Sequence, residues 1–181
     1  MSRSRLSLFE VDSDALAAFS TELRAALTAD DRGAVVRLLE LAGPPADRVR
    51  SAPHAVDVLL ASEAYPPSAE VFAALRRVAV ERALTLAWTS DSLALEGRLR
   101  GFEPLREDED LARRVDWLLD GHRVPWFLRR PGDTCGCLSG VDREAVSEGL
   151  EGLDDPPDEL VTFARALANL QAGALCHDTL L

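Results

Sequence analysis

The segment Cys135–Cys137, two cysteines around one glycine, holds the residues of this chain best suited to chemistry. A third cysteine, Cys176, lies directly before His177 near the end of the sequence. Thiolates and imidazoles are the soft ligands that zinc prefers in proteins. One hypothesis is therefore a zinc site, although paired zinc-binding cysteines more often have two or more residues between them. Its ligands would be Cys135, Cys137, Cys176 and His177, with His122 as a substitute.

Two other interpretations of the same segment stay open. The cysteines could form a redox pair, because the nearby Arg129 and Arg130 would favour thiolates and a disulfide across one residue is strained. Alternatively, the glycines serve as turn residues and the cysteines as small, buried packing residues. The packing interpretation fits the spacing best.

Aromatic and arginine side chains are densest just before this segment. Trp and Arg are enriched among the residues that dominate protein interfaces, so this cluster is a candidate partner-binding surface. Stacking of the same rings against arginine inside the fold is the alternative. Trp117 falls on the apolar stripe of an expected helix and is predicted to lie in the core. The predicted partner-binding residues are Arg123, Trp126, Phe127, Arg129 and Arg130.

Sequence motifs of the well-known enzymes are missing from the chain. It contains no lysine, which excludes Schiff-base chemistry and phosphate-binding loops that need lysine. The three histidines, His54, His122 and His177, have no neighbours typical of a general base. We therefore assign no catalytic residue, and zinc is the one cofactor considered.

Acidic residues outnumber basic ones by 31 to 20, which gives a formal net charge of −11. The excess is greatest in the C-terminal part, where only Arg143 and Arg165 oppose the acids after Thr134. Nucleic-acid binding needs a positive surface, so it is not expected. Solubility, a basic protein partner, or mimicry of DNA by acids spaced like phosphates would each suit this charge.

Apolar periodicity predicts a mainly α fold over one compact domain, residues 1–181, with about seven helices packed as a bundle. A short apolar run at 6–11 predicts an edge strand, and the proline-containing segment 123–128 an extended one. If these two pair in a small two- or three-stranded sheet, the class is α+β. The expected helices span about 13–29, 30–41, 56–60, 68–89, 107–119, 141–152 and 157–175.

The chain has no apolar run near the ~18 residues that a membrane span requires, and no apolar segment follows the arginines at its start. A cytoplasmic, bacterial protein without a membrane partner is expected. The function that fits best is non-enzymatic binding of another, basic protein, in a regulatory, adaptor or immunity/inhibitor-type role. The alternative is a metal- or thiol-dependent protein that uses Cys135 and Cys137.

Overall fold

The computed structural model describes residues 5–40, 69–129 and 132–178. Within the span predicted as one domain, the chain groups into two compact units, which are described separately below. Unit 1 comprises Met1–Val11, Thr85–Val124 and Pro131–Leu181. Unit 2 comprises Asp12–Leu84 and Pro125–Arg130.

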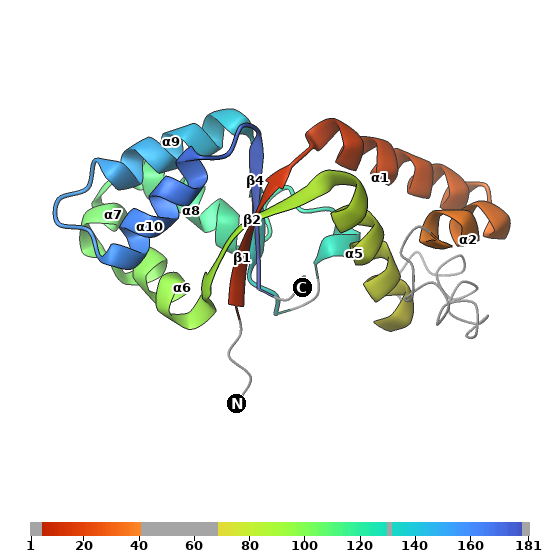
Figure 1. Ribbon diagram of the computed structural model, residues 1–181, viewed down its shortest axis with the longest axis horizontal. Helices are drawn as coiled ribbons and strands as arrows, with labels where there is room; N and C mark the ends of the chain where they lie inside the picture. Colours follow the sequence, from red (N-terminus) through yellow and green to blue (C-terminus); the bar gives the residue numbers. More distant parts are fainter. Residues whose placement is uncertain (1–4, 41–68, 130–131, 179–181) are drawn as a thin grey trace. The chain divides into compact units, whose positions relative to one another are not determined.

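Unit 1 is built on a four-stranded antiparallel sheet with the strand order β2-β1-β4-β3 (Figure 1). The sheet establishes an α+β fold, one of the two classes that the sequence predicted. The N-terminal strand is confirmed, but it lies between β2 and β4 and not at an edge of the sheet. The strands are β1 (Arg5–Val11), β2 (Leu84–Asp91), β3 (Cys135–Leu138) and β4 (Gly173–His177).

The register of the central strand β4 decides which side chains share a face. Cys176 lies opposite Leu8 of β1 and opposite Gly136 of β3, so these three residues share one face of the sheet. That face is part of an apolar core, to which Cys176 and Leu8 both contribute fully buried side chains. His177 and Leu175 lie on the other face and are also fully buried.

Five helices of unit 1 lie on one side of the sheet (Figure 1). They are α6 (Ser92–Gly101), α7 (Glu103–Glu107), α8 (Glu109–Leu119), α9 (Gly140–Glu151) and α10 (Asp158–Ala168). The carboxylate of Asp108 accepts hydrogen bonds from two backbone amides at the start of α8, and the hydroxyl of Ser139 accepts one at the start of α9. These caps satisfy amides that have no partner within the helix. The helices predicted at 107–119 and 141–152 are confirmed.

Unit 2 contains α1 (Ser13–Thr28), α2 (Arg32–Glu40), α5 (Ala69–Ala83) and a short 3-10 helix, η1 (Trp126–Leu128). The first two helices were predicted from their apolar spacing. The extended conformation predicted for 123–128 is wrong, because the amide of Leu128 donates to the carbonyl of Pro125 and closes a turn there. Residues 123–128 therefore do not join the sheet.

Two predicted helices are too long. The helix expected at 68–89 ends at Ala83, and the chain continues as β2. The helix expected at 157–175 ends at Ala168, and 173–177 form β4. In total, the described residues form eight α-helices. The short helix predicted near 56–60 lies outside the described residues. None of the helices in the described residues is long and apolar enough to cross a membrane.

Candidate functional site

The three cysteines do not lie on one face of the sheet. Cys135 and Cys137 are two residues apart in β3, so their side chains point to the same face, on which His177 also lies. Cys176 pairs with the intervening Gly136 and therefore points to the opposite face. The register separates one predicted sulfur ligand from the other two.

The predicted metal ligands all fall within the described residues, where their geometry can be compared with a metal shell. Across these residues, no group of three or more His, Cys, Asp or Glu side chains is placed to hold a metal ion. The ring of His122, the substitute ligand, stacks on Trp117 with centroids 4.5 Å apart. Arg113 lies over the same indole, which is half-buried beside the core and not fully within it. The zinc hypothesis therefore has no assembled ligand set in these parts of the chain.

The environment of the thiols disfavours redox chemistry. Burial raises the pKa of the Cys137 thiol to about 11, although the nearby Arg123 opposes the shift. Burial also raises the pKa of Cys176. Because the thiolate is the reactive form, thiols with raised pKa values are poor nucleophiles at neutral pH. Cys137, one of the two cysteines of the predicted redox pair, therefore lacks the activated character that such a pair needs.

The glycine between the cysteines has a packing role. A Cβ atom at Gly136 would lie 1.8 Å from the carbonyl oxygen of Trp117, inside α8. Gly136 is thus a strand residue at a close approach of β3 to a helix, and not the turn residue that the sequence suggested. This contact and the buried side chain of Cys135 agree with the packing interpretation of the segment.

His177 lies beside carboxylates, a grouping that was not predicted. Its imidazole is fully buried, with Nε2 3.7 Å from Asp133 Oδ2 and Nδ1 3.7 Å from Asp178 Oδ1. Oδ1 of Asp178 is buried without a hydrogen bond. Burial raises the pKa of Asp178, and the negative charges of Asp133 and Glu96 raise it further, while a hydrogen bond with the Thr134 backbone opposes them. The one hint in the sequence was that His177 and Asp178 are adjacent.

Replacing Asp178 with asparagine should raise the free energy of unfolding at neutral pH. The folded pKa of Asp178 lies above its unfolded value of about 3.9, so wild type loses stability as the pH rises through the folded pKa. Asparagine carries no charge and avoids that loss. Urea unfolding at a series of pH values should show the advantage at neutral pH and its disappearance below the unfolded pKa.

Asp142 provides a control, because its pKa is shifted in the opposite direction to that of Asp178. The hydroxyl of Ser139, 2.7 Å away, and the side chain of Arg114 lower the pKa of Asp142. Its charged form therefore stabilises the fold above about pH 3.9, and this stability is lost as the pH falls through the lowered pKa. Asp142→Asn should destabilise the protein at neutral pH. If both variants changed the free energy of unfolding in the same direction, the opposite pKa shifts assigned to Asp178 and Asp142 would be contradicted.

The predicted partner-binding residues separate into different environments. Trp126 is 41% exposed, whereas Phe127 is 1% exposed and packs edge-to-face on Phe19 with ring centroids 5.2 Å apart. Phe127 is therefore a core residue of unit 2 and is removed from the candidate surface. Arg129 is exposed in unit 2, whereas Arg123 belongs to unit 1, where it lies 3.6 Å from Asp142. Arg130 lies outside the described residues.

Unit 2 also contains a hollow of about 540 Å³. This volume is within the range of small-ligand pockets. Its polar side chains are partly engaged, because Arg82 pairs with Glu22 at 2.9 Å and Asp31 accepts the Ala34 amide at the start of α2. The hollow thus offers mainly methyl groups. Its lining consists of Glu22, Ala25, Ala26, Ala29, Asp31, Ala34, Arg37, Leu38 and Arg82.

Charge is divided unequally between the units. Over the full sequence, unit 1 holds 20 acidic residues and 10 arginines, a net charge of −10. Unit 2 holds 11 acidic residues and 10 arginines, a net charge of −1. Nearly all of the excess negative charge therefore belongs to the unit that contains the sheet.

Comparison with known proteins adds no family to this description. No family model matches the chain, no curated protein matches its sequence, and no solved structure matches its fold. The chain is therefore described by its own structure alone, as an α+β protein whose sheet-containing unit is strongly acidic.

Proposed function

We propose that this chain is a non-enzymatic binding protein whose acidic unit 1 holds a basic partner protein, in a regulatory, adaptor or immunity/inhibitor-type role. The observation that carries the proposal is the segregation of charge, −10 in unit 1 against −1 in unit 2. Complementary charge accelerates encounter with a partner and excludes partners of the same sign. A charge needed only for solubility has no reason to concentrate in one unit.

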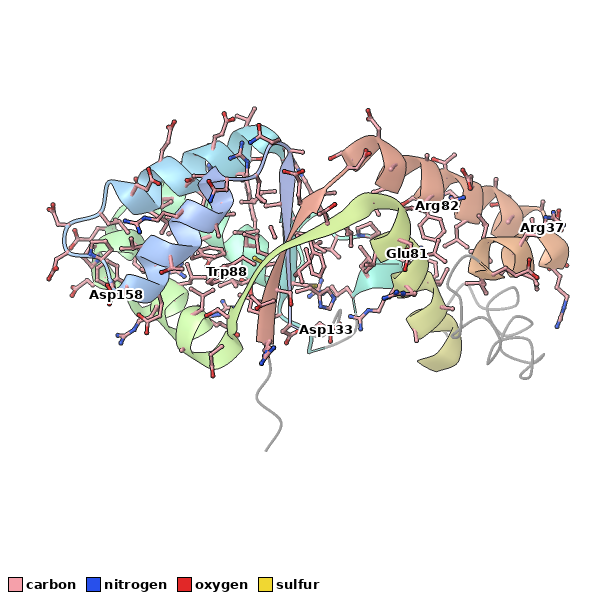
Figure 2. The ribbon with its side chains drawn as sticks, in the orientation of Figure 1. Arg37, Glu81, Arg82, Trp88, Asp133 and Asp158 are labelled. Carbon is pink, nitrogen blue, oxygen red and sulfur yellow. The ribbon has the colours of Figure 1, made fainter. Side chains whose placement is uncertain are left out.

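One group of uncompensated acids in unit 1 lies in the turn between α9 and α10 and at the adjoining ends of these two helices. Its exposed acids have no ion pair within the described residues, and Asp158 lies at the outer end of unit 1 (Figure 2). Glu148 and Glu151 also occupy the last turn of α9, which carries no basic residue. Negative charge is unfavourable at that end of a helix, so a cationic partner would relieve the repulsion. The exposed acids are Glu148, Glu151, Asp154, Asp155 and Asp158.

The test is affinity capture with the full chain and two variants that each lose two negative charges. The unit 1 variant is Glu148→Gln/Asp155→Asn, and the matched unit 2 variant is Asp14→Asn/Asp30→Asn. Asp155 and Asp30 both have left-handed backbones, with φ of 49° and 52°, which asparagine tolerates. Each captured protein is then purified, and its dissociation constant is measured against all three forms of the chain.

We expect a basic partner that the unit 1 variant binds about tenfold more weakly and that the unit 2 variant binds like wild type, since a lost close charge pair costs about 1.4 kcal/mol or more. Raising the ionic strength should weaken binding to wild type most. A partner set without basic proteins, or equal loss of affinity in both variants, would disprove the proposal.

A further inference from the structure

The sheet of unit 1 has two edges, and one of them is covered. Along β3, the amide of Gly121 donates to the carbonyl of Cys135 at 2.5 Å, and the amide of Cys137 donates to the carbonyl of His122 at 3.0 Å. Asp120 also forms a parallel bridge with Cys135. The segment after α8 therefore occupies the outer backbone groups of β3 and blocks this edge.

The opposite edge, β2, is open along most of its length. Thr85, Leu86, Ala87 and Thr89 are exposed, with Leu86 at 47%. In the described parts of the chain, no backbone hydrogen bond of a turn or loop reaches residues 84–91. An eight-residue edge strand without such cover presents a row of free amide and carbonyl groups.

The composition of β2 does not protect the edge either. Edge strands usually carry a charge, a proline or a bulge that prevents pairing with another chain. The strand has no proline, and its one charged residue, Asp91, is its last, where the carboxylate accepts the Ala94 amide at the start of α6. It is also held in place through Trp88 (labelled in Figure 2), because this side chain packs against Phe163 of α10 with ring centroids 5.7 Å apart. A fixed strand with free backbone groups is a template for strand addition.

We infer that β2 is a docking strand, which pairs along its open edge with an extended, uncharged segment of a partner protein that has basic residues at both ends. The inference rests on the proposed function and adds the way in which the partner binds. Main-chain hydrogen bonds to β2 supply affinity, and the basic ends meet the charge of unit 1, which is −10. A second copy of the chain fits less well, because it would bring the same negative charge.

The first test uses two capped peptides with the full chain. The strand probe is Arg-Arg-Thr-Val-Thr-Val-Thr-Val-Arg-Arg, and the charge-matched control is Arg-Arg-Gly-Ser-Gly-Ser-Gly-Ser-Arg-Arg. We expect the strand probe to bind at least tenfold more tightly, as measured by fluorescence anisotropy. In hydrogen exchange read by mass spectrometry, it should slow the amides of 84–91, and the control peptide should not.

Two proline variants test the contribution of the β2 backbone. Successive residues of a strand direct their amides to opposite sides, so one of Leu86→Pro and Ala87→Pro removes an outward donor and the other breaks pairing with β1. The variant that keeps the wild-type circular dichroism spectrum should bind the strand probe at least tenfold more weakly. If neither keeps it, hydrogen exchange of the wild-type chain decides the question.

The outcomes separate this inference from the proposed function. If the two peptides bind equally and the amides of 84–91 exchange at an unchanged rate, strand docking is wrong, and the proposed function is then decided by the capture experiment alone. No binding of the strand probe, or a folded proline variant that binds normally, also overturns strand docking. Self-association of the unbound chain in sedimentation, lost in the folded proline variant, would replace the partner segment by a second copy.

Discussion

Replacing Gly136 with alanine should lower the free energy of unfolding by about 3 kcal/mol, at the upper end of the range for over-packed interiors. The new Cβ would lie 1.8 Å from the carbonyl oxygen of Trp117 and 2.4 Å from the carbonyl carbon of Leu118. Both are backbone atoms of α8, which cannot rotate away as a side chain can. The alanine therefore has to separate β3 from the helix. Urea unfolding followed by circular dichroism measures the loss.

Two further glycines of unit 1 provide graded controls. Gly97, within α6, has no atom within 4 Å of a hypothetical Cβ, so Gly97→Ala should stabilise the protein by about 0.5–1 kcal/mol through helix propensity. At Gly149, the nearest atom is Cδ1 of Leu111 at 2.7 Å, the end of a flexible side chain that can move. Gly149→Ala should therefore cost less than Gly136→Ala. Equal costs at 136 and 149 would show that β3 can shift away from α8 without strain.

The sequence predicted elements with local signals well and missed strands that depend on distant partners. The helix at 13–29 combines regular apolar spacing with a capping residue, Asp12, and both signals lie within the segment itself. The strand β4 spans only Gly173–His177, and its partners lie in β1 and β3, one of them more than 160 residues earlier. No local period reveals such pairing. The same applies to β2, whose leucines continue the helical spacing of α5.

The candidate site shows the same limit at the level of single side chains. A spacing of two places Cys135 and Cys137 on one face once β3 is known to be a strand. The face on which Cys176 lies depends on the register between β4 and β3, which cannot be predicted from local sequence patterns. The carboxylate of Asp133 likewise comes to lie beside His177 through the pairing of β3 with β4, whereas Asp178 is simply the next residue in the chain. By contrast, the acidic excess after Thr134 was visible in the sequence, because net charge needs only a count.

Replacing Phe127 with alanine should lower the free energy of unfolding by about 3–5 kcal/mol, the range for removal of a buried phenylalanine. The ring is 1% exposed and packs edge-to-face on Phe19. The next residue, Leu128, is fully buried, and its carbonyl accepts a hydrogen bond from Arg76 of α5. Loss of the ring therefore leaves a cavity where η1 packs in unit 2. Urea unfolding read by circular dichroism is suitable, because it does not depend on tryptophan fluorescence.

Trp126 is the matched control, since it is the adjacent aromatic residue and is 41% exposed. Trp126→Ala should cost about 1 kcal/mol, typical of a partly exposed site, and Phe127→Leu less than about 1.5 kcal/mol, because it conserves most of the volume. The sequence analysis placed both aromatic residues in one partner-binding surface, but Phe127 is buried in the core of unit 2 and Trp126 is exposed. Comparable losses from both alanine variants would mean that Trp126 is also needed for packing and would leave no aromatic at this position for a partner.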